Sequence, residues 1–529
     1  MPSSSRVLIL VCLAIVLPSL IAGCGDGEPP SPSPPPPVRL AADSALAERA
    51  FAAAEELLSA AGLDLVLTGD PVAADLVVGS APHDASGVSF VTRYWAPVAA
   101  LSTPLADVTL ADLDGALAPI DPAPPLDEWG LAVQPMAIGE IPAALAADSI
   151  LVAMLPLDVI DARVRTLAVD GANVVFGIGD LNAYPLAEHA WVRRLDVEDE
   201  ALATTLDGVA RDLAARLALP PPEPIILRAT GDIIPARCVY AQQRDYGDYR
   251  HAFLALGPWL AEADITIGSL DASISDAGAP IGCEPTFNLL APPESVEGLV
   301  YGGFDVITVA TNHALNCGRS DCGSEALLDT LEILRSNGIA PVGGGADLAE
   351  ARAPTIVTVA GVSFAFLGYD KIAPPYHATE TRPGTAPLTE AVLREDIAAA
   401  RARADVVVVL PQWGVEYTAN PTIGQRRLAA AADAGADMVI GNHPHWVQAA
   451  EVIGETFVAY ALGNFVFDQD WSLETQQGVV LEAAFHGARL AGVRYVPIRI
   501  IDMHQPIFAE PAEAAQIMER IWTASAALD

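Results

Sequence analysis

Positive charge is scarce in this sequence of 529 residues. It has 28 lysines and arginines against 67 aspartates and glutamates, which gives a formal net charge of −39 at pH 7. Such a surface repels phosphate backbones, so we expect no nucleic acid partner. Lys371 is the single lysine in the chain; this fits a bias towards arginine and by itself indicates no chemistry.

Charged residues of both signs are also few, at 18%, whereas hydrophobic residues make up 52%. This composition is typical of a globular chain and not of a disordered one. The length allows two or three domains, each with a sizeable core.

The N-terminus has the pattern of an exported protein. A short start ending in Arg6 precedes an apolar run over residues 7–23, as in a secretory signal peptide. Residues 21–24, Ile-Ala-Gly-Cys, resemble a bacterial lipobox, which implies cleavage before Cys24 and a lipid on its thiol. An ordinary signal peptide and an uncleaved anchor are the alternatives, since such a run barely spans a bilayer.

A proline-rich stretch follows the lipobox. Residues 25–37 read GDGEPPSPSPPPP, a composition that gives an extended, semi-rigid tether. We therefore predict a lipoprotein signal peptide over residues 1–24 and a tether over 25–39. The folded body would then be extracytoplasmic and anchored to the cell membrane through its N-terminal lipid.

Cysteine is rare, with six in the chain. Cys12 would be removed with the signal peptide and Cys24 would be lipidated. The remaining cysteines are Cys238, Cys283, Cys317 and Cys322. An even number in an oxidising compartment predicts disulfides, with three possible pairings. We favour Cys238 with Cys283 and Cys317 with Cys322. A zinc site of four thiolates is the alternative, but its close-paired spacing is absent.

Residues 40–218 read as an α/β accessory domain. Apolar residues recur at helical spacing over 44–62, which predicts an amphipathic helix. Short apolar runs bounded by turn residues predict buried strands over 64–69, 74–80 and 172–179. Residues 93–117 resemble phosphate-type periplasmic solute-binding proteins, and a domain without its own ligand is the alternative. The proline-rich residues 219–224 mark the boundary.

From residue 225 onward, six apolar runs each lead into a polar cluster. The clusters contain Asp232; Asp271; Asn312 and His313; Gln412 and Glu416; His443 and His445; and Asn464. In open α/β sheets the loops at the carboxyl ends of strands converge. A turn or a helix cap would explain each cluster alone, but six together predict one polar site.

The residue types in these clusters suit a divalent transition metal. Carboxylate, amide oxygen and imidazole are ligands for Mn, Fe or Zn, so we expect one or two such ions. His443 and His445 lie two positions apart just past a strand end. They can turn towards one centre if Pro444 holds the bend.

The region from Ile225 to about Phe508 resembles the CapA family of capsule synthesis proteins, named for poly-γ-glutamate capsule formation, within the calcineurin-like metallophosphatase superfamily. The resemblance rests on Gly231-Asp232, Ser269-Leu270-Asp271, Thr311-Asn312-His313, Gln412-Trp413-Gly414-Val415-Glu416-Tyr417, Gly441-Asn442-His443-Pro444-His445 and Leu462-Gly463-Asn464-Phe465. It implies a four-layer α/β/β/α sandwich over residues 219–529.

The resemblance also implies a role for each matched residue. It implies metal binding by Asp232, Asp271, Asn312, Gln412, His443 and His445. His313 would face the substrate and protonate a leaving group. Glu416 and Asn464 would shape the site without binding metal.

Several positions depart from the family pattern. Gln412 stands where the family typically has His, Asp271 where it has Glu, and Asn316 where it has Asp. A neutral amide is a poorer ligand than imidazole for most first-row metals. We therefore expect a site that holds one metal, or holds two weakly.

Three functions compete. The first is a lipid-anchored, metal-dependent phosphoesterase-type hydrolase that acts in the synthesis or processing of a cell-envelope or capsular polymer such as poly-γ-glutamate. The second is a non-catalytic envelope protein that binds or guides an exported polymer through a degenerate metal site. The third is a solute receptor whose N-terminal half binds an anion, although residues 40–218 contain no evident anion-binding nest.

Overall fold

The computed structural model describes residues 35–79, 87–316 and 323–528. The predicted signal peptide, Cys24, most of the tether and the pairing of Cys317 with Cys322 lie outside the described residues. Within the described ranges, no helix is both long and apolar enough to span a bilayer.

The chain divides into two compact units, Met1–Ser89 with Trp191–Leu217, and Phe90–Ala190 with Ala218–Asp529. Residues 90–190, which the sequence analysis placed in the accessory domain, thus group with the C-terminal region. The predicted domain boundaries themselves stay a prediction.

The first unit is a small α/β body. Its elements are strands β1 (Val38–Ala42), β2 (Leu65–Leu67), β3 (Leu76–Gly79) and the end of β11 (Ala187–Arg194), and helices α1 (Ala47–Ala60) and α4 (Glu200–Leu217). β1 lies parallel to both β2 and β3, and β11 pairs with β3 in the antiparallel sense. The predicted helix over 44–62 is α1, and the runs at 64–69 and 74–80 contain β2 and β3.

Residues 90–190 form an α/β lobe of the second unit. Its elements are β4 (Val88–Ala99), β5 (Asp107–Val108), β6 (Leu117–Pro119), β7 (Gln134–Met136), β8 (Val152–Pro156), β9 (Arg165–Thr166), β10 (Ala168–Val169), α2 (Leu126–Trp129) and α3 (Ile141–Ala147). The lobe shares a buried cluster with Ala484 and Ala491 of the C-terminal region. The guanidinium of Arg489 also donates to the Leu157 carbonyl at 2.8 Å.

The strand predicted over 172–179 is wrong. The segment is a tight turn, closed by a bridge between Asn173 and Ile178. The Asn173 side chain accepts hydrogen bonds from the backbone N–H groups of Val175 and Phe176, at 3.0 and 3.3 Å. Burial of Val174 and Val175 explains the apolar run without a strand, because an asparagine side chain satisfies the turn.

Two sheets build the C-terminal region. The first has the order β17 (Ala340–Val342), β16 (Val306–Thr308), β13 (Ile265–Leu270), β12 (Ile225–Ile233), β27 (Gln477–His486), β28 (Arg489–Ile501) and β29 (Gln505–Phe508), with β26 (Asn464–Val466) beside β12. The second has the order β19 (Thr355–Val359), β20 (Val362–Asp370), β22 (Val406–Gln412), β23 (Met438–Ile440), β25 (Thr456–Ala459) and β24 (Ala450–Ile453). The smaller pairs are β14 (Ser273–Ile274) with β15 (Leu290–Ala291) and β18 (Gly344–Gly345) with β21 (Gly384–Thr385).

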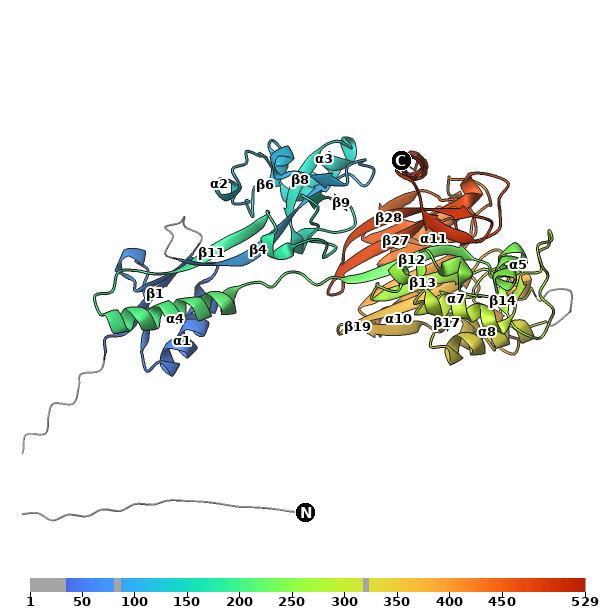
Figure 1. The fold of residues 1–529 in the computed structure, drawn as a ribbon, viewed down its shortest axis with the longest axis horizontal. Coiled ribbons are helices and arrows are strands. Elements are labelled where there is room, and N and C mark those ends of the chain that lie inside the picture. Colours follow the sequence, from blue (N-terminus) through green and yellow to red (C-terminus); the bar gives the residue numbers. More distant parts are fainter. Residues whose placement is uncertain (1–34, 80–86, 317–322, 529) are drawn as a thin grey trace, which may run out of the picture. The chain divides into compact units, whose positions relative to one another are not determined.

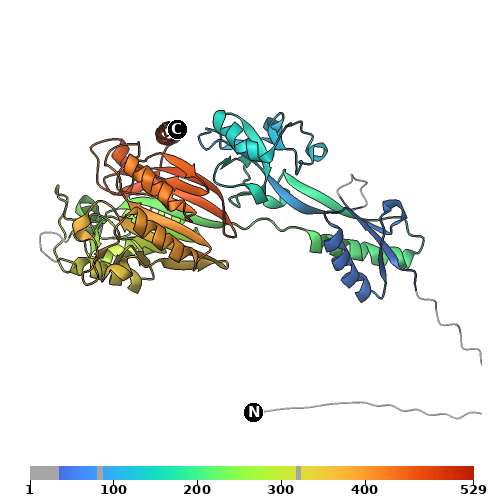
Figure 2. The same cartoon turned by 180° about the vertical axis from the view of Figure 1, so that it is seen from behind.

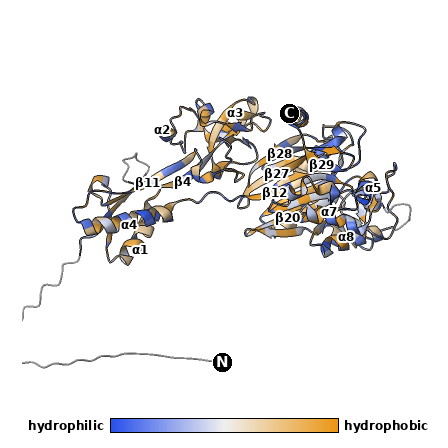
Figure 3. Ribbon diagram, in the orientation of Figure 1, coloured by the Kyte–Doolittle hydropathy of each residue, from blue (hydrophilic) through white to orange (hydrophobic). Residues whose placement is uncertain are grey.

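The two sheets pack face to face. Val406 and Val408 of β22 share a buried cluster with residues of the first sheet, and Phe364 meets Phe485 edge to face at 5.1 Å. Side chains alternate across a strand, so Val407 of β22 belongs to the core on the opposite face. Hydrophobic colour accordingly runs along these strands (Figure 3).

Helices cover the outer faces of both sheets (Figures 1 and 2). They are α5 (Arg237–Tyr246), α6 (Gly257–Leu260), α7 (Val296–Tyr301) and α8 (Glu325–Ser336) with the first sheet, and α9 (Leu348–Ala351), α10 (Glu390–Arg401), α11 (Ile423–Ala432) and α12 (Pro511–Ala526) elsewhere in this region. Leu331 of α8 and Ile307 of β16 belong to one buried cluster, and Ile397 of α10 and Val407 of β22 belong to another. The predicted four-layer α/β/β/α sandwich is confirmed.

Candidate functional site

Parallel strands in both sheets bring the predicted residues to one edge. β12, β13 and β16 run parallel in the first sheet, and β20, β22 and β23 run parallel in the second. The polar residues sit at or just after the carboxyl ends of these strands: Asp232, Asp271, Asn312, His313, Gln412, His443 and His445.

Hydrogen bonds across the two sheets show that these residues meet. The amide nitrogen of Gln412, in the second sheet, donates to Asn312 Oδ1 at 3.2 Å and to Asp271 Oδ1 at 3.4 Å. The backbone N–H of His443 donates to Asp232 Oδ2 at 3.1 Å. Asp232, Asp271, Gln412 and His443 are all at most 5% exposed. The structure therefore forms one buried polar site from loops that are distant in sequence.

Two glycines permit this convergence. A Cβ on Gly231 would lie 2.0 Å from the Gly463 carbonyl oxygen, and one on Gly441 would lie 2.2 Å from that of Tyr460. Neither position tolerates a side chain without moving backbone. The glycines that precede Asp232 and the histidine pair thus allow the site strands to approach their neighbours closely.

The two histidines occupy an unusual backbone bend. His443 has φ of 98° and His445 has φ of 58°, values that L-residues rarely adopt. Their ring centroids lie 6.0 Å apart. The bend thus comes from both histidines and not from Pro444 alone, and such strain is characteristic of functional sites.

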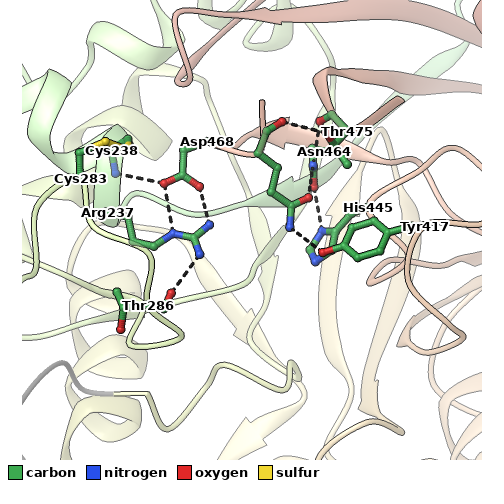
Figure 4. Close-up of polar contacts among 10 residues, drawn as sticks. Arg237, Cys238, Cys283, Thr286, Tyr417, His445, Asn464, Asp468 and Thr475 are labelled. Atoms are coloured by element: carbon green, nitrogen blue, oxygen red, sulfur yellow. Dashed lines mark hydrogen bonds and ion pairs between the residues drawn. A yellow bond between two sulfur atoms is a disulfide. The ribbon is translucent and has the colours of Figure 1, made fainter. Parts of the chain in front are cut away.

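A polar chain holds the His445 ring (Figure 4). Its Nδ1 lies 2.9 Å from Asn464 Oδ1, and the Asn464 amide nitrogen donates to Gln469 Oε1 at 3.1 Å and to the Thr475 carbonyl at 2.9 Å. With both donors of the Asn464 amide used, its oxygen accepts from a protonated Nδ1. The lone pair of the His445 ring therefore lies on Nε2, which is the nitrogen available to bind a metal.

Two carboxylates are buried here without a cationic partner. Asp232 and Asp271 are both 0% exposed, and within the described residues neither pairs with lysine or arginine. Burial, followed by the Asp271 charge, raises the pKa of Asp232 well above its ordinary value. Burial of two ionised carboxylates without a counter-charge costs several kcal/mol of desolvation free energy per ion. A bound cation would remove this cost.

The neighbouring imidazoles do not supply that charge. Burial, followed by repulsion from His445, lowers the pKa of His443 to about 3. Burial also lowers the pKa of His445. Both rings are therefore neutral at pH 7, which is the form that binds metal.

His313 lies half-buried beside this cluster. Its Nδ1 contacts Asn316 Oδ1, and the Asn316 amide nitrogen donates to the Tyr376 hydroxyl at 3.1 Å. As with His445, an asparagine oxygen orients the ring and leaves Nε2 free. The arrangement fits a residue that handles a proton.

Glu416 is exposed. The next residue, Tyr417, lies nearer the site: its ring stacks on His445 with centroids 6.1 Å apart, and its hydroxyl accepts from Gln469 at 3.4 Å. Tyr417, to which the sequence analysis gave no role, thus contacts the His445 ring, and the site-shaping role of Glu416 stays a prediction.

A second polar group lies near Asn464 in Figure 4. Cys238 and Cys283 form a disulfide, the pairing that we favoured from the sequence, so the four-thiolate zinc site does not form. Asp468 accepts from the Cys238 backbone N–H at 3.1 Å and pairs with the guanidinium of Arg237. Asp468 therefore anchors the start of α5 to the segment that follows β26, and the disulfide ties the same helix to the segment between β14 and β15.

The comparisons with known proteins concern this same region. A family model described as bacterial capsule synthesis protein PGA_cap matches residues 226–469. Capsule biosynthesis protein CapA of Bacillus anthracis is 31% identical over 287 residues, which cover 53% of this chain and 68% of that protein. PGA biosynthesis protein CapA of Bacillus subtilis (strain 168) is 31% identical over 278 residues, covering 52% and 70%.

The chain belongs to the bacterial CapA capsule synthesis family. The resemblance predicted from the motifs is confirmed. Among solved structures, a phosphatase from Mycoplasma pneumoniae aligns with 54% of this chain and 95% of its own, at 10% identity and a TM-score of 0.35.

The side chains of this CapA-family site fit a divalent cation in their chemistry. In the described part of the chain, no three His, Cys, Asp or Glu side chains form a group that could hold a metal ion. However, buried atoms with lone pairs are left without hydrogen-bond partners, namely Asp232 Oδ1, Asp271 Oδ2, Gln412 Oε1, Asn442 Oδ1 and His443 Nδ1. Two carboxylates, two amides and an imidazole are oxygen and nitrogen donors suited to Mn, Fe or Zn.

Asn442 is the residue that the sequence analysis missed. Asn442 is 4% exposed, and its backbone forms an isolated β-bridge with Gln412 at the end of β22. Its side-chain oxygen has no hydrogen-bond partner. Its place between Gly441 and His443 in the matched motif was the available signal. Gln469 and Tyr376, which hold Asn464 and Asn316 by hydrogen bonds, could not be identified from the sequence, because they reach the site only through tertiary contacts.

Proposed function

We propose that this CapA-family chain is a metal-dependent, phosphoesterase-type hydrolase in the synthesis or processing of a capsular polymer. The observation that carries the proposal is the pair of buried carboxylates, Asp232 and Asp271, without a lysine or arginine partner among the described residues. Buried charge of one sign is retained only where a counter-charge binds. The relatives named for capsule and PGA biosynthesis support a γ-glutamyl polymer as the context.

The residues that would hold the cation are Asp232, Asp271, Asn312, Gln412, His443 and His445, with Asn442 beside them. A divalent ion in such a site supplies activation of water and neutralisation of charge on the electrophile. The electrophile is phosphorus in our principal proposal, and the amide of a γ-glutamyl bond is the alternative.

The chain itself would manage the proton and the geometry. With Nδ1 held by Asn316, the Nε2 of His313 is the atom that would deliver a proton to the leaving group, from a ring that carries protons on both nitrogens. Asn464 keeps His445 in one orientation and tautomer. The burial of Asp232 and Asp271 excludes bulk water, which strengthens every electrostatic interaction in the site.

A non-catalytic polymer-binding protein is the second candidate, and one observation favours it. The Gln412 amide nitrogen donates to both Asp271 and Asn312. These bonds use lone pairs that an active centre would direct to a metal. In this alternative the Gln412 amide satisfies side-chain oxygens that would otherwise bind a metal, and the site is the remnant of a metal centre that no longer catalyses a reaction.

Metal analysis of the purified full chain, beside a phosphodiesterase assay with Mn²⁺, tests the proposal. We expect stoichiometric metal and activity that a chelator removes and Mn²⁺ restores. Bound metal without activity would support the relict site. Absence of metal after growth and purification with Mn²⁺ would refute the hydrolase and leave the non-catalytic relict site.

We also propose that the protein acts outside the cytoplasm, as a lipoprotein held at the membrane through Cys24. The lipobox-like residues 21–24 and the proline-rich stretch after them support this proposal. A polymer that is exported would meet the enzyme there.

A further inference from the structure

A cavity of about 760 Å³ adjoins the candidate site, and the proposed metal ligand His443 is part of its lining. Lys371 follows the end of β20, Trp413 follows β22 and His443 follows β23, and all three line the cavity. The cavity therefore begins where the proposed chemistry would take place and extends along the same edge of the second sheet.

Lys371 has a fixed position beside this chemistry. Its backbone N–H donates to the Gln412 carbonyl at 2.9 Å. The buried Asp370 side chain accepts from the N–H groups of Ile372 and Ala373, at 2.7 and 3.2 Å. The turn that carries Lys371 is thus held on both sides, while the side chain itself is exposed.

The ammonium of Lys371 has no acidic partner among the described residues. The other charged residues of the lining, Glu390 and Arg427, form an ion pair with each other. Lys371 is therefore the uncompensated charge of the cavity. It is also the single lysine of a chain whose net charge is −39.

Other groups at the cavity favour an anion too. The first residues of α10 and α11 lie in its lining, and helix N-termini carry partial positive charge. Because salt screens exposed charges beyond about 10 Å, these local groups outweigh the distant acidic surface for a ligand inside the cavity.

We propose that this cavity is a binding subsite for an anionic group of the substrate, a carboxylate or a phosphate, and that Lys371 binds that group. The subsite rests on the proposed function, because it is defined by its place beside the site to which His443 belongs. A γ-glutamyl polymer carries a free α-carboxylate on each residue, and a phosphoester carries phosphate oxygens. An ammonium recognises either as a point charge.

The single lysine permits a direct binding experiment. Reductive methylation of the full chain with ¹³C-formaldehyde would give one ε-dimethylamine NMR signal, from Lys371, and the Lys371→Arg variant identifies it against the N-terminal amine. We expect the signal to shift and saturate when inorganic phosphate or a γ-glutamyl oligomer is added. Saturation by the oligomer alone assigns the subsite to carboxylate, and saturation by phosphate alone assigns it to phosphate. No shift with either overturns the proposal.

Variants separate this subsite from the metal site. Lys371→Gln should weaken binding of the effective ligand about 10-fold or more, as loss of a charged hydrogen bond predicts, and Lys371→Arg should retain most of the affinity. Arg403→Gln removes one charge from an exposed position outside the cavity and should have no effect. Metal content should equal that of the wild type in all three.

The outcomes distinguish the two proposals. Normal metal content with unchanged ligand affinity in Lys371→Gln would refute the subsite and leave the hydrolase intact. If the protein binds no metal but the NMR signal of Lys371 still shifts with ligand, the result would support the subsite and refute the proposed hydrolase. Loss of metal in Lys371→Gln would overturn the subsite, since the residue would then act through the metal centre.

Discussion

His445 Nδ1 lies 2.9 Å from Asn464 Oδ1, and the Asn464 amide nitrogen is bound by Gln469 and Thr475. Because this contact fixes the tautomer of a proposed ligand, Asn464→Ala should weaken metal affinity by about 10–100-fold, the usual effect of losing such a support. Asn464→Asp keeps an acceptor oxygen and is the matched control. Titration with Mn²⁺ measures the change, and equal affinities for the alanine variant and the wild type would remove His445 or Asn464 from the metal site.

The three histidines should divide into two classes. His443→Ala and His445→Ala should lose bound metal, because both rings are buried and neutral and lie in the site. His313→Ala should keep metal and lose any hydrolysis, because we assign this residue to proton transfer. Metal content measured on each folded variant decides the matter. If His313→Ala also loses metal, His313 is a ligand and the acid lies elsewhere.

Gln412→His should tighten metal binding. Imidazole is a better donor than an amide for most first-row metals, and the strand end already places residue 412 against Asp271 and Asn312. The gain should be about 1–3 kcal/mol, the order expected around metal sites.

Activity at limiting metal gives the second readout for Gln412→His. Tighter binding with higher activity supports the hydrolase, and tighter binding without activity supports the relict site. Unchanged affinity would mean that residue 412 does not face the metal.

Cys24→Ser should abolish membrane attachment. If Cys24 carries the lipid, each buried CH₂ contributes about 0.8 kcal/mol to anchoring, and several chains together hold the protein firmly. Labelling with a radioactive fatty acid and fractionation of cells check this. A variant that is processed and located like the wild type would contradict the lipoprotein proposal.

Removal of the disulfide should destabilise the second unit. Cys238 and Cys283 are 45 residues apart in sequence, and the chain-entropy relation gives about 4 kcal/mol for a loop of this length. Urea unfolding of Cys238→Ser/Cys283→Ser measures the loss of unfolding free energy. Arg244→Gln, an exposed position on the same helix, serves as control. An unchanged midpoint for the double variant would mean that the crosslink adds no stability.

Much of this fold was predictable because its strands are buried on both faces. Continuous apolar runs in β12, β22 and β23 and the polar residues that end them are visible in the sequence, and parallel strands bring such ends to one edge. The same reasoning failed at residues 172–179, where Asn173 closes a turn. An apolar run alone does not distinguish a buried turn from a strand.

By itself, the sequence determined which residue types reach the site and in what order, because local patterning and matched motifs are properties of the chain. Only the tertiary structure decided what those residues contact. The bond from Gln412 to Asp271 spans 141 positions in sequence and joins two sheets. The turn beside Gln412 likewise places Lys371, which the sequence left without a role, in the cavity with His443. Such contacts depend on how the sheets pack, and packing is a property of the whole core and not of any one segment.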